Sequence, residues 1–125
     1  MAEELILIVD DNAQNRKLAR DVLEFAGFRT LEADGGRAGV ALAVEHLPDL
    51  VLMDIRMYDL DGIEARGILR NDERTAAIPV VALTSSTMKG DRERFLAEGF
   101  DGFLEKPISV REFPDQVRSH LRAEP

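Results

Sequence analysis

The chain has 125 residues, of which 45% are hydrophobic and 32% charged, a balance typical of one globular domain and unlike a disordered tail. Its formal net charge of −8 disfavours attraction to nucleic-acid phosphates or anionic lipid. The absence of cysteine excludes disulfides, thiolate catalysis and cysteine-ligated zinc, and the N-terminus lacks a signal-peptide or membrane-helix pattern, so we expect a cytoplasmic protein without a nucleic-acid or membrane partner.

Short runs rich in aliphatic residues alternate with helical patterns along the chain. The predicted strands cover residues 5–9, 28–33, 50–53, 79–83 and 102–105. This alternation is typical of successive βαβ units, so it predicts an α/β fold: a doubly wound five-stranded parallel sheet with helices on both faces. The first, third and fourth runs are continuously apolar, as in central strands, whereas 28–33 alternates like an edge strand. The predicted strand order is 2-1-3-4-5, the flavodoxin-like arrangement.

The segments between the strands carry apolar residues at helical spacing. The faces predicted to be buried are Leu18/Val22/Phe25, Val40/Val44/Leu47 and Val110/Phe113/Val117/Leu121. Gly27 is placed to end the first helix, and Pro114 predicts a distorted first turn in the last one. The weakest helical pattern covers residues 88–98, where Gly90 and few apolar anchors predict low local stability.

Polar side chains follow four of the predicted strands at the point where each strand ends. Asp10 and Asp11 come after the first strand, Asp54 after the third, Thr84 after the fourth and Lys106 after the fifth. Because the carboxyl ends of parallel strands share one edge of the sheet, where ligands bind, we expect these side chains to converge. Each of them alone would fit an ordinary turn or helix cap, but their joint placement disfavours that interpretation.

The charges predicted at this edge do not balance. Two carboxylates about 4 Å apart repel by roughly 4 kcal/mol at an effective dielectric constant near 20. Lys106 brings one positive charge against the three negative charges of Asp10, Asp11 and Asp54, and a divalent cation would cancel the difference. Ligands that are all oxygen favour a hard ion such as Mg²⁺ over zinc, so the sequence predicts a magnesium site.

The predicted metal site gives Asp54 a chemical role. Magnesium in a small carboxylate site usually keeps waters and also binds phosphate, and Asp54 would be the nucleophile that forms an acyl phosphate. Thr84 would donate a hydrogen bond to the phosphoryl oxygens and Lys106 would pair with their charge. Asp59 and Asp61, which follow in the same loop, are interpreted as ordinary loop acids.

With these residues in place, the chain resembles the receiver domain of two-component response regulators over essentially its whole length. The matching pieces are VDDN (9–12), DLVLMDIRM (49–57), DG (61–62), IPVVALTS (78–85) and GFLEKPI (102–108). Because little else is present, the chain looks like a stand-alone regulator of the chemotaxis or cell-cycle type. We expect a single domain covering residues 1–125, without an output domain.

The resemblance implies a chemistry for the acidic cluster. Asp54 would accept a phosphoryl group from a phosphohistidine on a sensor histidine kinase or a histidine phosphotransfer protein. Mg²⁺ would be held by Asp11, Asp54 and the backbone carbonyl of Arg56, with Asp10 acting through water. The protein would be a signalling switch that catalyses only its own phosphorylation and dephosphorylation, rather than an enzyme acting on a separate substrate.

The resemblance also implies a way of transmitting the signal. Thr84 and Phe103 align with the family's switch pair, a hydroxyl residue and an aromatic residue that swings inward on phosphorylation, and Pro107 would set the geometry of the loop after Lys106. The output surface would be the fourth helix, the fifth strand and the fifth helix, which would bind a downstream protein target. We expect a monomer or a weak dimer.

The chain departs from the family pattern at several positions. Tyr58 stands where the family usually has proline, so the loop after Asp54 is less constrained. The switch aromatic residue is Phe103 instead of the commoner tyrosine, which removes a hydroxyl group. Arg56 and Ser86 occupy positions that tune the lifetime of the phosphoryl group in this family.

Three other functions fit the same sheet less well. A flavin binder would place its phosphate beside Asp10 and Asp11, where repulsion is strong, and the GGRAG motif at 35–39 lacks the spacing of dinucleotide sites. A magnesium-dependent phosphohydrolase would need a substrate pocket and a dedicated acid or base, and the sequence indicates neither. An interaction module that had lost the chemistry would not need the complete acidic set.

Overall fold

The computed structural model describes residues 4–55, 57, 59–84, 93–94 and 97–121 of the chain. Five strands form one parallel sheet in the order β2-β1-β3-β4-β5, so the predicted fold class and strand order are confirmed. The strands are β1 (Leu5–Val9), β2 (Arg29–Ala33), β3 (Leu50–Asp54), β4 (Val80–Thr84) and β5 (Gly102–Glu105).

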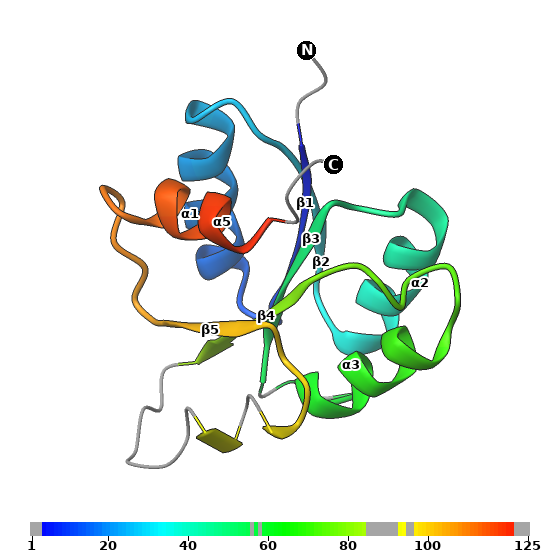
Figure 1. Cartoon of the computed structure of the whole chain (residues 1–125). Helices are drawn as coiled ribbons and strands as arrows, with labels where there is room; N and C mark the ends of the chain where they lie inside the picture. The colour runs from blue at the N-terminus through cyan, green and yellow to red at the C-terminus, as the bar shows by residue number, and fades with distance from the viewer. Residues whose placement is uncertain (1–3, 56, 58, 85–92, 95–96, 122–125) are drawn as a thin grey trace.

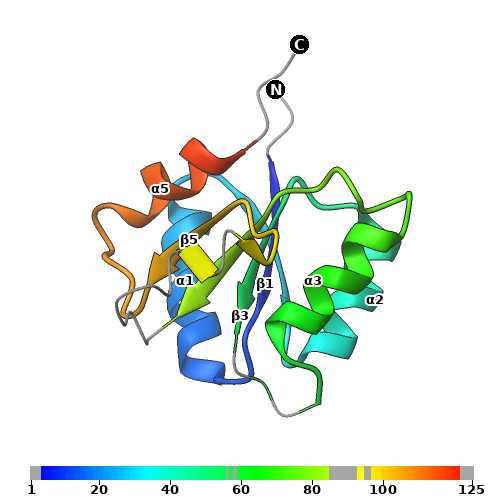
Figure 2. The same cartoon turned by 60° about the horizontal axis from the view of Figure 1, so that its bottom comes forward.

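Helices cover both faces of the sheet. They are α1 (Ala13–Phe25), α2 (Gly36–His46), α3 (Gly62–Asn71) and α5 (Phe113–His120). Helices α1 and α5 lie on one face and α2 and α3 on the other, as Figures 1 and 2 show from two directions. Between β4 and β5, residues 93, 94 and 97 have helical backbone, but most of the weak helical pattern at 88–98, Gly90 included, lies outside the described residues. No helix in the described ranges is long and apolar enough to cross a membrane.

The sheet separates two hydrophobic cores. The α2/α3 core includes Leu7, Val9, Val51, Met53, Val80 and Ala82. The α1/α5 core includes Ile6, Ile8, Leu50, Leu52, Phe113 and Val117. All five residues of β3 and of β4 are buried, as the continuously apolar runs predict, and burial of each large side chain contributes roughly 1.5 to 3 kcal/mol. This two-sided burial holds the strand ends, and the polar residues that follow them, in register.

The buried face of α1 differs from the prediction. Ala19 and Leu23 are buried, whereas Phe25 is 96% exposed and Leu18 is 39% exposed. Successive residues of a helix are separated by about 100°, and Val22 borders both the predicted stripe and the observed one, so spacing alone did not distinguish them. The predicted helix stop is confirmed: Gly27 follows the C-cap with a φ of 101°, in the left-handed region that favours glycine.

Helix α2 packs unusually close to the sheet because small residues face it. A Cβ atom on Gly39 would lie 2.8 Å from a methyl carbon of Val9, so this glycine permits the close approach. The predicted residues Val40 and Val44 are only half-buried. Leu47 is 52% exposed because it follows the last helical residue and turns the chain away with a φ of 49°.

The last helix agrees with most of its prediction. Phe113 and Val117 are fully buried, and α5 begins only at Phe113, with Pro114 in its first turn. The preceding residues form a turn, in which Ser109 Oγ accepts a hydrogen bond of 3.3 Å from the backbone N–H of Glu112. Val110 lies in this turn and is 61% exposed, so its predicted burial is wrong.

Candidate functional site

Three carboxylates meet at the carboxyl-terminal edge of the sheet. One oxygen from each of Asp10, Asp11 and Asp54 lies within 4.8 Å of the others, so these three side chains could hold one metal ion. Asp10 is 1% exposed and Asp54 is 8% exposed. Lys106 Nζ lies 2.7 Å from Asp10 Oδ2 and 3.3 Å from Asp54 Oδ2. The convergence expected from the strand assignment is thus observed for these four residues.

Strand register explains why these side chains meet. Val9 of β1 pairs with Met53 of β3, so the next residues, Asp10 after β1 and Asp54 at the end of β3, lie side by side. On the other side of β3, Asp54 pairs with Leu83, the residue before Thr84 in β4. The site therefore follows from the parallel order of the strands and needs no separate structural element.

Asp10 is held by both its side chain and its backbone. Its carboxylate accepts hydrogen bonds from the backbone N–H of Asn12 at 2.9 Å and from Lys106 Nζ at 2.7 Å. Its own N–H donates to the carbonyl of Ala33 in β2 at 3.1 Å, and its carbonyl accepts a bond of 2.7 Å from Arg16 Nη1 in α1. Each of these bonds removes freedom from the loop that also carries Asp11.

Lys106 leaves the cluster with an excess of negative charge. Its side chain is 15% exposed, and those of Asp10 and Asp54 are 1% and 11% exposed, so their interactions are poorly screened by water. Among these four described residues, one ammonium group against three carboxylates leaves a net charge of −2, which a dication would cancel. The donor atoms are all carboxylate oxygens, the type that Mg²⁺ prefers, so the residues present fit this ion.

The loop after β3 is fixed at its far end. The backbone N–H of Gly62 donates to the carbonyl of Ile55 at 2.9 Å, and a Cβ atom at this position would lie 2.4 Å from the carbonyl oxygen of Asp54. Asp61 caps α3 by accepting a bond of 2.8 Å from the N–H of Glu64. The DG pair at 61–62 thus brings the start of α3 against the backbone of the predicted phosphate acceptor.

Asp59 joins this loop to a different helix, which the sequence analysis did not foresee. Its carboxylate accepts hydrogen bonds from the N–H groups of Gly36 at 3.0 Å, Arg37 at 3.2 Å and Leu60 at 2.8 Å. Burial alone would raise the pKa of the Asp59 carboxyl, but the backbone donors outweigh it and hold the pKa below its ordinary value. A Cβ atom on Gly35 would lie 2.9 Å from Asp59 Oδ1, so part of the GGRAG motif makes room for this contact.

Thr84 and Phe103 lie on adjacent strands. Thr84 is 5% exposed and ends β4, and Phe103 of β5 pairs with Ala82, two residues before Thr84. Because side chains two apart in a strand share a face, Thr84 and Phe103 are on the same face of the sheet, and Phe103 packs against the α2/α3 core. The geometry therefore permits contact between the predicted switch residues.

Several predicted features remain outside what the structure tests. Arg56, Tyr58 and Ser86 lie outside the described residues, so the proposed carbonyl ligand and the lifetime-tuning positions stay predictions. Pro107 follows Lys106 through a cis peptide bond, and the N–H of Lys106 donates to the carbonyl of Thr84 at 2.8 Å.

Two residues that contact the loops of the site were not predicted from the sequence. Arg16 and Asp59 act through hydrogen bonds to backbone groups, six residues away for Arg16 and 23 for Asp59, and no motif marks such contacts. The one available signal was a basic residue in the first turn of a helix, where the helix dipole disfavours positive charge.

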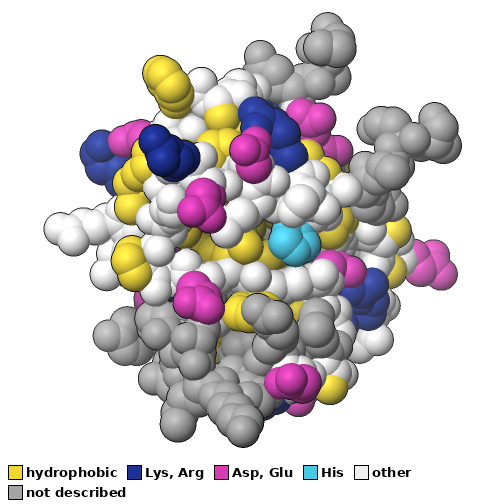
Figure 3. All heavy atoms as spheres, turned by 60° about the vertical axis from the view of Figure 1, so that its left-hand side comes forward, with side chains coloured by type: hydrophobic (Ala, Val, Ile, Leu, Met, Phe, Trp, Pro, Cys, Tyr) yellow, Lys and Arg dark blue, Asp and Glu magenta, His cyan; other side chains and the backbone are white. Residues whose placement is uncertain are grey.

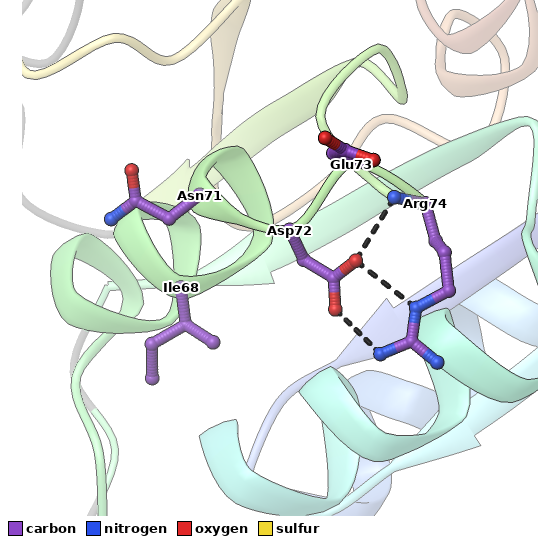
Figure 4. A pocket seen from close by; sticks show the side chains of 5 residues that line it. All are labelled: Ile68, Asn71, Asp72, Glu73 and Arg74. Atoms are coloured by element: carbon purple, nitrogen blue, oxygen red, sulfur yellow. Dashed lines mark hydrogen bonds and ion pairs between the residues drawn. The ribbon is translucent and has the colours of Figure 1, made fainter.

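A surface hollow lies away from the acidic cluster. It has a volume of about 600 Å³ and is lined by Ile68, Asn71, Asp72, Glu73 and Arg74 at the C-terminal end of α3 (Figure 4). Hydrogen bonds from Arg74 lower the pKa of Asp72 to about 2. This hollow is wide open, and the charges of Asp72 and Arg74 already pair with each other, so the acidic cluster is the better candidate for chemistry.

Comparison with known sequences gives the same family throughout. The family model of the response regulator receiver domain matches residues 6–118. The polar-differentiation response regulator DivK of Brucella ovis is 42% identical over 116 residues, which cover 93% of this chain and 94% of that protein. The DivK protein of Brucella anthropi is 41% identical over the same length.

Solved structures agree with this assignment. The chemotaxis protein CheY4 of Vibrio cholerae superposes with a TM-score of 0.89 at 26% identity, covering 96% of this chain and 100% of that one. The receiver domain of the sensor histidine kinase PA1611 from Pseudomonas aeruginosa PAO1 has a TM-score of 0.86 at 32% identity, covering 95% and 98%, and has a magnesium ion coordinated in its active site cleft. From the strand order, the acidic cluster and these matches, we conclude that the chain belongs to the receiver-domain family of two-component response regulators.

Proposed function

We propose that this receiver domain is a phosphorylation-dependent switch in which Asp54 accepts a phosphoryl group from a sensor histidine kinase or a histidine phosphotransfer protein. The observation that supports this proposal most directly is the cluster of Asp10, Asp11 and Asp54, with ligand oxygens within 4.8 Å of one another and Lys106 bound to two of them. A site of this charge is suited to a metal dication and a transferable anion.

Asp54, Lys106 and Thr84 have separate roles in the transfer of the phosphoryl group. A carboxylate oxygen of Asp54 attacks phosphorus while the bond from phosphorus to the donor imidazole nitrogen breaks, and the bonding pair returns to that nitrogen. Lys106, already 3.3 Å from Asp54 Oδ2, pairs with the new phosphoryl charge, and the Thr84 hydroxyl donates to a phosphoryl oxygen. Bound Mg²⁺ would supply positive charge to the phosphoryl oxygens during transfer.

The two neighbouring acids have different roles in this proposal. Asp10 is 1% exposed and its carboxylate is engaged by Lys106 and by the N–H of Asn12, so it would hold the metal through water instead of directly. Asp11 and Asp54 would be the direct carboxylate ligands, and the backbone carbonyl of Arg56 would complete the protein's contribution.

The switch works by a change in population of two conformations. Moving a population from 1:99 to 99:1 takes about 5.5 kcal/mol, whereas a charge-assisted hydrogen bond contributes roughly 1.5 to 3 kcal/mol. Thr84 and Lys106 together would contribute about 3 to 6 kcal/mol, which reaches that value only at the upper end, so the element that moves must be marginally stable beforehand. The weak helical pattern of the sequence at 88–98 makes that stretch the candidate for this role, and Phe103 on β5 would couple it to a downstream protein that binds β5, α5 and the helix predicted between β4 and β5.

The proposal is tested by incubating the protein with Mg²⁺ and acetyl phosphate and measuring its intact mass. We expect the wild type to gain one phosphoryl group that hydroxylamine removes, because an acyl phosphate reacts with this nucleophile. Asp54→Asn should gain none, and Asp11→Asn should gain it much more slowly because it keeps the acceptor but loses a metal ligand. A gain that persists in Asp54→Asn, or a wild type that stays unmodified with Mg²⁺ present, would contradict the proposal.

A further inference from the structure

Arg16 connects the acidic loop to the second strand. Its Nη1 donates a hydrogen bond of 2.7 Å to the carbonyl oxygen of Asp10, and its Nε lies 3.3 Å from Glu32 Oε1 in β2. The Arg16 side chain is 18% exposed and that of Glu32 is 27% exposed, so the pair is partly shielded from solvent. The guanidinium group is thus held by a carboxylate on one side while it holds a backbone carbonyl on the other.

The position of Arg16 in its helix calls for a physical reason. It lies in the first turn of α1, where exposed N–H groups and the helix dipole disfavour a cation. Asn12 already caps this helix by accepting a bond of 3.0 Å from the N–H of Asn15. The contacts of Arg16 with Asp10 and Glu32 are therefore the interactions that favour a basic residue here.

The carbonyl that Arg16 binds controls the direction of Asp11. The carbonyl of Asp10 and the N–H of Asp11 belong to one planar peptide unit, so fixing the carbonyl fixes the plane from which the Asp11 side chain departs. The other side of Asp10 is tied as well, since its N–H donates to the carbonyl of Ala33, next to Glu32 in β2. Among the residues that the structure describes, none donates a hydrogen bond to the Asp11 carboxylate, so within this part of the chain the backbone is the route by which its direction is set.

We infer that Arg16 is a positioning residue for the metal site: through the peptide between Asp10 and Asp11 it holds the Asp11 carboxylate in the direction needed to bind Mg²⁺. Glu32 sets the orientation of the guanidinium group and is the second member of this arrangement. The inference rests on the proposed function, because it presumes that the acidic cluster binds magnesium. Loss of a residue that orients a metal ligand typically weakens metal binding about tenfold or more.

Electrostatics alone predicts the opposite sign, which makes the inference testable. Removing a positive charge beside an acidic cluster should strengthen the binding of a cation. If Arg16 positions Asp11, Arg16→Met should instead weaken it. The sign of the change in Mg²⁺ affinity therefore separates a positioning residue from a nearby charge.

Arg20 provides a matched control. It lies one helical turn further along α1, carries the same charge and binds the same carboxylate, with Nη1 2.9 Å from Glu32 Oε2. Its recorded hydrogen bonds go to Glu32 and Asp21. Arg20→Met thus removes a charge and a Glu32 contact while it leaves the bond from Arg16 to Asp10 in place.

The experiment measures the Mg²⁺ dissociation constant by isothermal titration calorimetry for the wild type, Arg16→Met, Arg16→Lys and Arg20→Met, with the urea midpoint of each metal-free protein. We expect Arg16→Met to bind about tenfold more weakly, and Arg20→Met to stay within about twofold of the wild type because its charge is screened. Arg16→Lys should fall between the wild type and Arg16→Met, since an ammonium group can reach one of the two oxygens but lacks the planar fork.

The outcomes separate this inference from the proposed function. If the wild type binds Mg²⁺ and both Arg16 variants bind it as well or more tightly, the positioning role is wrong and the proposed function stands. If the wild type binds no Mg²⁺ at millimolar concentration, the proposed function fails and the inference fails with it. Should Arg16→Met not fold, Arg16→Lys decides on the same criterion, together with the amide chemical shift of Asp11 in the metal-free protein.

Discussion

At the scale of single residues, Lys106 has two opposing effects on the acidic cluster. It binds Asp10 at 2.7 Å and Asp54 at 3.3 Å, so it holds together two carboxylates that would otherwise repel. The same ammonium group already neutralises part of the negative charge of the carboxylates that a dication would otherwise neutralise. Lys106 therefore stabilises the metal-free protein and at the same time competes with the metal.

Lys106→Met should separate these two effects. In the absence of metal we expect the free energy of unfolding to fall by on the order of 3 kcal/mol, because two poorly exposed carboxylates lose their counter-charge. Mg²⁺ should bind more tightly than to the wild type and restore most of the loss. Urea unfolding with EDTA and with Mg²⁺ measures both effects.

The exposed Lys17 offers a control for that experiment, since its side chain is 68% exposed and pairs only at the surface. Lys17→Met should change stability by less than about 0.5 kcal/mol under both conditions. A Lys106→Met protein that is as stable as the wild type without metal would show that repulsion in the cluster is already relieved by other means.

The hydrogen bond from the Thr84 hydroxyl to the phosphoryl group is expected to stabilise the phosphorylated state more than it speeds the transfer. Thr84→Ala should leave Asp54 able to take up a phosphoryl group, while the gain in partner affinity on phosphorylation falls by about 1.5 to 3 kcal/mol, the value of one charge-assisted hydrogen bond. Thr84→Ser keeps the hydroxyl and should retain most of that gain. The comparison is made by measuring partner binding before and after treatment with acetyl phosphate, and an unchanged gain in Thr84→Ala would refute the role.

At the scale of elements, the loop after β3 is attached to two helices. Asp61 caps α3, and Asp59 accepts hydrogen bonds from the first N–H groups of α2. Tyr58 precedes Asp59 in the sequence, and a tyrosine does not restrict the backbone as a proline would. The hydrogen bonds that the Asp59 carboxylate accepts from α2 restrain the loop, and they depend on the ionisation of this carboxyl group.

The contribution of Asp59 should therefore depend on pH. Its pKa is lower in the folded protein than its ordinary value of 3.8, so its stabilisation is fully present above that value and is lost as the pH falls through the lowered pKa. Asp59→Ala should be less stable than the wild type at neutral pH, and the difference should shrink in acid. Thermal unfolding between neutral pH and pH 2 measures it.

Asp34 gives the comparison for the pH series, because it is an exposed acid just before α2. Asp34→Ala should track the wild type across the same range more closely than Asp59→Ala does. A difference between the wild type and Asp59→Ala that stays constant down to the lowest pH would mean that the hydrogen bonds do not require the charged form.

At the scale of the whole molecule, metal binding and folding are coupled. The three carboxylates come from two strands that are distant in sequence, so the site exists only in the folded chain. A ligand that binds the folded state alone stabilises it by about 2.7 kcal/mol at a concentration one hundred times its dissociation constant.

We thus expect Mg²⁺ at that excess to raise the free energy of unfolding of the wild type by this amount, and Asp54→Asn to gain much less. Chemical unfolding in Mg²⁺ and in EDTA provides the measurement. Equal stabilisation of both proteins would place the ion elsewhere, for example among the acidic and basic side chains that are interspersed on the face shown in Figure 3.

The sheet and most of the site could be predicted because their signals are local. Each strand was a short apolar run, and the site residues follow directly from where those runs end. The buried face of α1 could not be predicted as well, because Val22 belongs to two neighbouring stripes and only the packed sheet selects Ala19 and Leu23 over Phe25. Contacts such as that of Arg16 with the carbonyl of Asp10 have no sequence motif, since any carbonyl would serve as the acceptor.

The sheet divides the interior into two cores, and this division affects how the sequence of the domain can evolve. Leu52 and Met53 are joined by a peptide bond, yet one packs in the α1/α5 core and the other in the α2/α3 core. Substitutions in different compartments that lie more than about 10 Å apart should therefore combine additively in their effect on the free energy of unfolding. One flank can accumulate new side chains, and with them new binding partners, while the opposite flank keeps its original architecture.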